Sequence, residues 1–367
     1  MTAFANRHTI KIVHVAGGLG IGGTEKTMQL FATGINRERF TAYVYSHRDG
    51  PRRALIEQAG VKVFVGQDLF SILERIKPHI IHVHRAGWPE RQKMRAIILH
   101  KGRKTLPIVM ETNVFGRYDN TPDDAYIDRH IFVSKFCLER YLRHNAIEAA
   151  PPKYSYLYNP IEVDAFHDAA YKRVWDANSP VVGRLSRDDP GKWSPVGWEF
   201  LPLALKRCPS LKYRIIGAIE AAKRYFENNG LVSSVQLSPT VLNLTELCAF
   251  YASLNIFLHA NKTGESFGNV IAEAMASGLP VVTLASEGDK DNAQAELVDH
   301  GVTGYVARTL EEYAGHVATL LGDLHLAKRM GQRGYEKAKR EFDAPVVTRK
   351  LEAIYEESLA LALARPV

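Results

Sequence analysis

Residues 262–283 read KTGESFGNVIAEAMASGLPVVT and run from a polar loop through a helical stretch into a strand. The apolar run before them, Ile256–Leu258, is predicted to be a buried strand, and Phe267–Ser277 is predicted to be a helix. A strand, a glycine-containing loop and a helix in this order are typical of a βαβ unit in a parallel sheet. The first turn of the helix offers backbone amides that can hold a diphosphate, at Gly268, Asn269 and Val270.

Two glutamates flank the start of this helix. Glu265 lies just before it, and Glu273 lies one turn beyond Asn269 on the same face. A carboxylate at Glu273 can accept hydrogen bonds from the two hydroxyls of a ribose. Taken alone, however, the pair is equally compatible with a helix N-terminal charge and a solvated helix face.

The alternation of strands and helices continues along the whole 367-residue chain. In the first half the predicted strands are Ile10–Ala16, Phe40–Ser46, Val61–Val65, Ile80–Val83, Ile108–Met110 and His130–Val133. In the second half they are Pro180–Gly183, Lys212–Ile216, Ser234–Leu237, Ile256–Leu258 and Pro280–Leu284. This pattern predicts an α/β protein with two doubly wound, Rossmann-like domains that face a central cleft. The polar stretch Asp164–Asn178 is interpreted as the linker between them.

Composition excludes several classes of protein. Hydrophobic residues make up 46% and charged residues 24%, as in ordinary globular proteins, and no apolar run approaches the roughly 20 residues that span a bilayer. Three widely separated cysteines argue against a disulfide framework or a structural zinc site. The first residues lack the apolar core of a signal peptide, so we expect a cytoplasmic protein.

The glycine-rich loop after the first strand, GGLGIGGTE at residues 17–25, can bring backbone amides close to a phosphate. Gly18, Gly20 and Gly23 satisfy the G-x-G-x-x-G pattern of dinucleotide sites. The acidic residue that an NAD site needs is missing after the second strand, although Arg48 could serve an NADP site. A tight turn without a ligand is the third interpretation.

Several motifs, in order and spacing, resemble retaining glycosyltransferase family 4, which has the GT-B fold. The stretch from Glu265 to Glu273, followed by Ala-Met-Ala-Ser-Gly-Leu-Pro, is similar to the family signature. Further similar segments are Gly22-Gly23-Thr24-Glu25, Ile81-His82-Val83-His84, Val133-Ser134-Lys135-Phe136, Asn159–Asp164, Gly183-Arg184-Leu185 with Lys192, and Glu296-Leu297-Val298. The resemblance implies an N-terminal acceptor-side domain at 1–170, a donor-binding domain at 171–345 and a C-terminal helix within 346–367 that packs back on the first domain.

The family implies a retaining, metal-independent enzyme that needs no cofactor. It would move a sugar from a UDP- or GDP-linked donor to a glycan, lipid-linked or small-molecule acceptor. The residues implied as catalytic are His84, Arg184, Lys192 and Glu265. Those implied to bind the nucleotide sugar are Gly22, Gly23, Arg187, Phe267, Gly268, Asn269, Val270 and Glu273. In these roles Glu273 binds the ribose, the cations neutralise the diphosphate, and His84 lies at the transferred sugar.

The chain also departs from the family pattern. Arg184 and Lys192 are eight positions apart instead of five or six, so Arg187 could be the partner of Lys192. The threonine-histidine pair expected after the fifth strand is Thr112-Asn113, which leaves the acceptor side open. About one D-x-D motif is expected by chance in a chain of this composition, and the chain has one at Asp289–Asp291, so no metal site is predicted. An NADP-dependent oxidoreductase, a GT-B nucleotide-sugar epimerase or phosphorylase, and an inactive GT-B scaffold remain as alternatives.

The basic excess of the chain lies in its first half, where residues 1–175 carry 26 Lys and Arg against 17 Asp and Glu. Within it, residues 85–104 hold Arg85, Arg91, Lys93, Arg95, Lys101, Arg103 and Lys104. Part of this segment reads as an amphipathic helix, which could lie on the anionic inner face of a membrane or could simply cover the sheet. No nucleic-acid partner is predicted.

Overall fold

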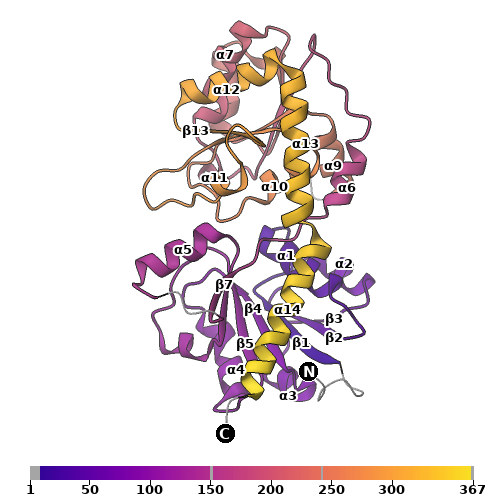
Figure 1. The fold of residues 1–367 in the computed structure, drawn as a ribbon, viewed down its shortest axis with the longest axis vertical. Coiled ribbons are helices and arrows are strands. Elements are labelled where there is room, and N and C mark those ends of the chain that lie inside the picture. Colours follow the sequence, from indigo (N-terminus) through magenta and orange to yellow (C-terminus); the bar gives the residue numbers. More distant parts are fainter. Residues whose placement is uncertain (1–8, 149–151, 241–242, 365–367) are drawn as a thin grey trace. The chain divides into compact units, whose positions relative to one another are not determined.

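The structure, a computed structural model, describes residues 9–148, 152–240 and 243–364. Contacts divide the chain into two units, Met1–Pro160 with Ala344–Val367 and Ile161–Asp343 (Figure 1). Each unit is built on one parallel sheet with helices, which confirms the predicted α/β class and the Rossmann-like architecture.

The first unit has a sheet in the order β3-β2-β1-β4-β5-β6-β7, with every neighbouring pair parallel. Its strands are β1 (Ile10–Ala16), β2 (Phe40–Ser46), β3 (Lys62–Val65), β4 (Ile80–Arg85), β5 (Ile108–Asn113), β6 (Arg129–Phe132) and β7 (Tyr154–Tyr156). Its helices are α1 (Gly23–Gly34), α2 (Arg52–Gln58), α3 (Leu69–Ile76), α4 (Arg91–Lys101), α5 (Lys135–His144) and α14 (Ala344–Leu363), with a 3₁₀ turn η1 (Pro122–Tyr126). The strand order reverses between β1 and β4, where sheets of this kind bind ligands.

The second unit repeats this order as β10-β9-β8-β11-β12-β13, again with parallel pairing. Its strands are β8 (Val181–Leu185), β9 (Lys212–Ile216), β10 (Val235–Ser238), β11 (Ile256–His259), β12 (Val281–Leu284) and β13 (Gly304–Ala307). Its helices are α6 (Val163–Ala169), α7 (Val196–Arg207), α8 (Glu220–Asn228), α9 (Leu244–Ala252), α10 (Asn269–Ala276), α11 (Gln294–Leu297), α12 (Leu310–Gly322) and α13 (Leu324–Glu341), with 3₁₀ turns η2 (Pro190–Lys192) and η3 (Val232–Ser234). Here the reversal lies between β8 and β11.

The predicted strands are all present, and two short edge strands were missed. β7 spans Tyr154–Tyr156 and β13 spans Gly304–Ala307, and both lie at the edge of their sheets. A run of three or four residues at an edge is too short to show a clear period, so the sequence did not reveal either strand.

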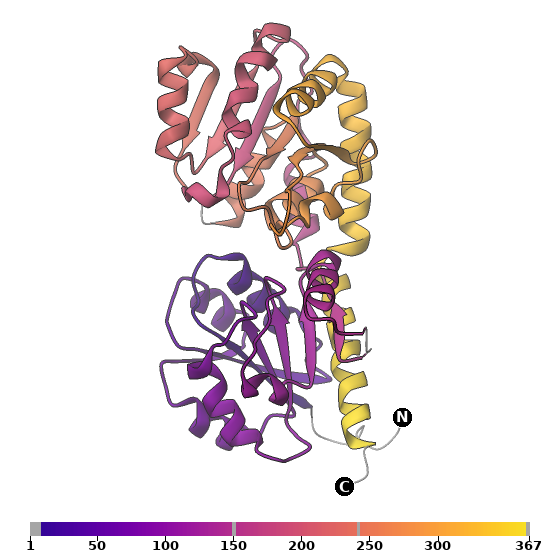
Figure 2. The same cartoon turned by 90° about the vertical axis from the view of Figure 1, so that its left-hand side faces the viewer.

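The C-terminal helix α14 belongs to the first unit, and Figures 1 and 2 both show it along that unit's sheet. Its buried residues recur every four positions on one face, at Val347, Leu351, Tyr355 and Leu359. They share a core cluster with Ile12 of β1, Ile80 of β4 and Ile108 of β5. Residues of β1 and of α14, which are far apart in the sequence, therefore belong to the same hydrophobic core.

The linker prediction is wrong for the first part of Asp164–Asn178. Residues Val163–Ala169 form α6, which packs against α9, α10 and α13 within the second unit. Val163 and Phe166 are fully buried and anchor the helix. Two apolar side chains among polar neighbours gave too weak a pattern to predict it.

Among the described residues, no helix is both long enough and apolar enough to cross a bilayer.

Candidate active site

Glu265 and Lys192 form the centre of a polar cluster at the β8–β11 reversal of the second unit. Lys192 Nζ donates to Glu265 Oε2 at 2.9 Å, and the two side chains are 25% and 15% exposed. The Glu265 Oε1 atom lies 3.3 Å from His259 Nε2 and accepts from the amide of Asn261. Burial raises the pKa of Glu265, but Lys192 and His259 outweigh it and bring that pKa to about 2. Glu265 is therefore an ionised acceptor at neutral pH.

The loop that carries Glu265 is held in place before any ligand arrives. Glu265 N–H donates to Gln294 Oε1 at 2.9 Å, and its carbonyl accepts from Ala293 N–H at 2.9 Å. Gly264 has φ +71°, and a side chain there would overlap the carbonyl of Asp291. Glycine at this position thus lets the loop approach the segment before α11 closely enough to fix Glu265.

Arg184 and Arg187, the two candidates for the partner of Lys192, are in different environments. Arg184 is 1% exposed, and its guanidinium lies over the Trp193 ring at 4.2 Å. Its Nη2 atom donates to the carbonyl of Lys192 and, at 3.0 Å, to Asn261. Arg187 is 63% exposed and lies 3.9 Å from Asp189. In this structure Arg184 supports the turn that presents Lys192, whereas Arg187 is accessible to solvent.

The start of α10 brings the remaining predicted residues of this half together. Gly268 caps the helix with φ +105°, where a side chain would be strained, and Asn269 and Val270 form the first turn. Phe267 is 2% exposed and packs edge-on against Phe342 at 5.5 Å, so its side chain lies in the core.

Glu273 is one turn further along α10 and is 4% exposed. Its Oε2 atom accepts from the hydroxyl of Tyr251 at 3.0 Å, and the carbonyl of Val270 lies 3.1 Å from the same hydroxyl as a second acceptor for its one proton. Burial and the charge of Glu273 raise the pKa of Tyr251 well above its usual value, so Tyr251 stays a hydrogen-bond donor. The sequence did not reveal Tyr251, which lies 22 residues away on α9.

In the first unit the glycine loop and His84 lie at the β1–β4 reversal. Gly22 is the N-cap of α1 and Gly23 is its first residue. His84 is 2% exposed and near the end of β4, where its Nε2 atom lies 3.1 Å from His14 Nδ1 on β1. His14 carried no motif of its own and was not predicted.

His82, two residues before His84 on β4, is packed inside the first unit. Its Nδ1 atom lies 2.6 Å from the hydroxyl of Tyr355 on α14, and its Nε2 atom lies 2.8 Å from Thr112 Oγ1. The ligand atoms of His14, His82 and His84 lie within 4.8 Å of one another, close enough for a metal ion. However, both ring nitrogens of His82 have partners, and the His82 and His84 rings stack at 4.4 Å and 26°. Stacked rings direct their lone pairs side by side rather than toward one point, so this trio is poorly arranged to bind a metal.

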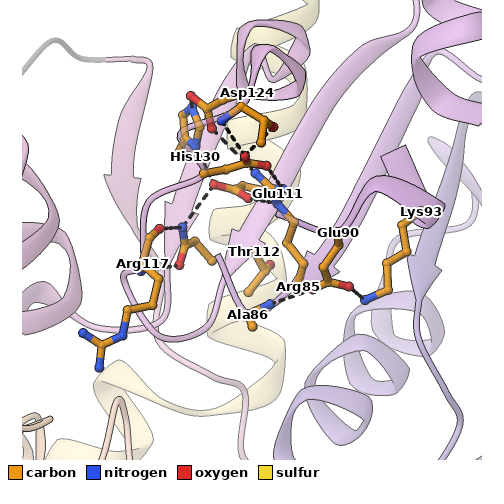
Figure 3. A network of polar contacts seen from close by, with 12 residues as sticks. Arg85, Ala86, Glu90, Lys93, Glu111, Thr112, Arg117, Asp124 and His130 are labelled. Atoms are coloured by element: carbon orange, nitrogen blue, oxygen red, sulfur yellow. Dashed lines mark hydrogen bonds and ion pairs between the residues drawn. The ribbon is translucent and has the colours of Figure 1, made fainter. Parts of the chain in front are cut away.

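Arg85, the first cation of the basic segment, is the centre of a buried ion-pair network (Figure 3). Its guanidinium contacts Glu111 and, at 2.7 Å, Asp119, and all three side chains are at most 1% exposed. On the other side of Glu111, its Oε1 atom lies 2.5 Å from His130 Nδ1. Asp124 lies 3.6 Å from Arg85 and is the most exposed carboxylate of the group at 16%. No sequence motif predicted that these residues contact one another.

The basic segment 85–104 is therefore less exposed than its composition suggests. Besides Arg85, Lys101 is 7% exposed and donates to Asp128 at 2.6 Å, and Lys93 pairs with Glu90. The cations that remain exposed are Arg91, Arg95, Arg103 and Lys104.

Comparison with known proteins identifies the second unit. Residues 180–323 match the family described as glycosyl transferases group 1, so the chain carries a domain of that family. Over 205 residues the chain is 29% identical to a phosphatidyl-myo-inositol mannosyltransferase of Mycobacterium tuberculosis, with 54% of this chain and 52% of that protein covered. Over 149 residues it is 25% identical to the capsular polysaccharide biosynthesis glycosyltransferase CapM of Staphylococcus aureus, with 40% and 38% covered. The matches thus span about half or less of these relatives.

Solved structures extend the likeness of the fold to both units. A glycosyltransferase from Rickettsia africae has a TM-score of 0.77 at 18% identity, covering 96% of this chain and 99% of its own. The Anabaena protein Alr3699/HepE, solved with UDP and glucose, has a TM-score of 0.70 at 18% identity, covering 95% and 100%. These structures confirm the GT-B fold predicted from the motifs.

Proposed function

We propose that this chain, with its group 1 glycosyl transferase domain, is a retaining enzyme that moves a sugar from a nucleoside diphosphate to an acceptor hydroxyl without a metal ion. The observation that carries the proposal is the Lys192–Glu265 pair, held beside the first turn of α10 at the ligand-binding edge of the second sheet. The acceptor is proposed to be a glycan, a lipid-linked sugar or a small molecule.

The geometry supports a division of roles around the donor. Lys192 and the first-turn amides of α10 would stabilise the negative charge that grows on the departing diphosphate. Glu265, ionised and partly exposed, would accept hydrogen bonds from hydroxyls of the donor sugar. The second carboxylate, Glu273, would accept from the ribose. In the first unit, His84 and the Gly22-Gly23 loop are proposed to contact the substrates.

In the proposed reaction, the bond between the anomeric carbon and the phosphate oxygen breaks, and the acceptor oxygen forms its bond on the same face of the sugar. The departing phosphate oxygen takes the proton of the acceptor hydroxyl. This route retains the configuration and needs no protein nucleophile.

Nucleotide binding tests the assignment of Glu273. We expect UDP or GDP to raise the melting temperature of the protein, because a ligand that binds only the folded state stabilises it. Glu273→Gln is expected to weaken this binding about tenfold, since the amide cannot accept from both ribose hydroxyls as a carboxylate does. Thermal shifts over UDP, GDP, ADP, dTDP and NADP measure both effects.

Glu227→Gln on the exposed face of α8 serves as the matched control and should bind as the wild type does. Stabilisation by NADP and by none of the diphosphates would instead favour the dinucleotide interpretation of the N-terminal glycine loop.

A second proposal concerns peripheral membrane association through residues 85–104. Arg91, Arg95, Arg103 and Lys104 remain exposed on and after α4, and each cation near an anionic surface adds about 1 kcal/mol. We expect co-sedimentation with liposomes to rise with anionic lipid content and to fall as salt increases. Arg91→Glu with Arg95→Glu should abolish it, whereas Lys223→Glu with Arg224→Glu on α8 should not. Equal recovery with neutral and anionic liposomes at low salt would refute the proposal.

A further inference from the structure

His259 and Thr283 form a buried pair at the carboxyl end of β11 in the second unit. They are register partners on the neighbouring parallel strands β11 and β12, and they are 2% and 0% exposed. His259 Nδ1 lies 2.9 Å from Thr283 Oγ1, and His259 Nε2 lies 3.3 Å from Glu265 Oε1. The imidazole therefore connects a buried hydroxyl with the carboxylate of the proposed donor site.

The two neighbours of His259 decide which of its nitrogens carries the proton. Glu265 is ionised at neutral pH and can only accept, so the nitrogen that faces it, Nε2, carries the N–H. Burial lowers the pKa of His259 below its ordinary value of 6.5, even though the hydrogen bond and the charge of Glu265 act against this. At pH 7.5 the ring thus has a single proton, and Nδ1 accepts a hydrogen bond from the hydroxyl of Thr283.

Asn261 is a second donor to the same oxygen of Glu265. Arg184 can only donate, and its Nη2 atom lies 3.0 Å from Asn261 Oδ1, so the amide nitrogen of Asn261 faces Glu265 Oε1. Asn261 is 5% exposed, which keeps this amide inside the second unit. A carboxylate oxygen offers about two lone-pair sites, and His259 and Asn261 together use both of those on Oε1.

The other oxygen of Glu265 keeps a site for a ligand. Within the described part of the chain, Oε2 accepts from Lys192 Nζ alone, at 2.9 Å, which leaves one of its two lone-pair sites. The side chain of Glu265 is 15% exposed, so the carboxylate is not fully enclosed. A ligand hydroxyl that donates to Glu265 therefore has Oε2 as its acceptor.

We propose that His259 is a positioning residue that accepts from Thr283 and donates to Glu265 Oε1, and thereby holds the carboxylate with Oε2 available to a hydroxyl of the donor sugar. The proposal rests on the proposed function, which brings a nucleotide sugar to Glu265. It extends that function by specifying which oxygen acts, in which direction the hydrogen bonds run, and which two buried residues fix the carboxylate.

Nitrogen NMR tests these hydrogen bonds without any substrate. The full-length protein is labelled with ¹⁵N-histidine, long-range ¹H–¹⁵N correlation spectra are recorded at pH 7.5, and His259→Gln assigns the signals of His259. We expect a proton on Nε2 and none on Nδ1. Thr283→Val keeps the shape of the side chain but removes the hydroxyl, so it should shift the Nδ1 resonance to higher frequency, because this nitrogen then accepts no hydrogen bond.

Ligand binding tests the effect on Glu265. The probes are UDP-glucose with UDP and GDP-mannose with GDP, and calorimetry uses the pair that binds the wild type. His259→Leu is expected to weaken binding of the nucleotide sugar about tenfold and to change that of the nucleoside diphosphate little, because Glu265 would contact the sugar. His259→Gln, whose amide can donate from the position of Nε2, should restore most of the affinity, and Thr283→Val should lie between His259→Leu and the wild type.

Leu258→Ala is the matched control for lost stability. Leu258 is fully buried on the same strand, and its neighbours in the core are apolar. This substitution should lower the melting temperature and leave the ratio of the two affinities as in the wild type.

A proton on His259 Nδ1 of the wild type at pH 7.5 would overturn the proposal, even if every variant failed to fold. A His259→Leu protein that keeps the wild-type ratio of affinities for nucleotide sugar and nucleoside diphosphate would also overturn it, since His259 would then not act through Glu265. A wild-type protein that binds neither pair would count against the proposed function alone, because the spectra decide the hydrogen bonds independently of any ligand.

Discussion

Replacing Lys192 with glutamine is expected to lower kcat for sugar transfer by a hundred- to a thousandfold, roughly the effect of removing one donor to a developing anion. Charge on the leaving diphosphate is greatest in the transition state, so the KM for the donor should change much less than kcat. Glutamine is chosen because it can still donate to Glu265 Oε2, which Lys192 contacts at 2.9 Å. The variant therefore separates the loss of charge from the loss of the contact.

Steady-state kinetics at saturating acceptor measure this effect. The matched control is Lys262→Gln, an exposed lysine on the same loop as Glu265, which should transfer at the wild-type rate. If Lys192→Gln keeps the wild-type kcat while remaining folded, the cation acts only as a structural partner of Glu265. Arg187→Gln then becomes the variant to compare, because Arg187 is exposed and lies between β8 and the turn η2 that carries Lys192.

Replacing Arg85 with alanine is expected to lower the free energy of unfolding by about 3–5 kcal/mol. The substitution leaves the carboxylates of Glu111 and Asp119 without their cation, and both side chains are only 1% exposed. Urea denaturation of the purified chain measures the loss. Arg95→Ala removes an exposed arginine from the neighbouring helix α4 and should change the free energy of unfolding by less than about 0.5 kcal/mol.

Because the pKa of Glu111 is lowered in the folded protein, the free energy of unfolding should fall as the pH falls. Burial raises the pKa of Glu111, but His130 and Arg85 outweigh it and bring that pKa to about 2, below the ordinary value of 4.5. The contribution of Glu111 is therefore fully present above pH 4.5 and is lost as the pH falls toward 2. In Arg85→Ala this pKa should rise, so the acid loss of stability should begin at a higher pH. An Arg85→Ala protein as stable as the wild type would show that water reaches these carboxylates.

Local sequence determined the architecture of this chain. The alternation of β-branched runs with helical stretches predicted the parallel sheets. The repeat of apolar side chains that distinguishes a strand from a helix is set by residues close together in the sequence. The loop before α10 could also be predicted from the sequence. Glu265, Gly268 and Glu273 lie within nine residues, and their spacing alone places them around the start of one helix. The resemblance to retaining glycosyltransferase family 4 rests on such short segments, and the match of residues 180–323 to glycosyl transferases group 1 agrees with it.

Only the tertiary structure decided which polar groups meet. His14 and His84 are 70 residues apart, and Arg85 and Glu111 are 26 apart, so the register of β1, β4 and β5 brings them together. The sequence also did not predict which polar residues are buried. The motif around Arg184 predicted a cation that contacts the ligand, whereas in the fold Arg184 is buried against Trp193. Spacing along the chain determines which face of an element a residue occupies. Which residue it contacts there, and how deeply it is buried, depend on the packing of elements that are far apart in the sequence.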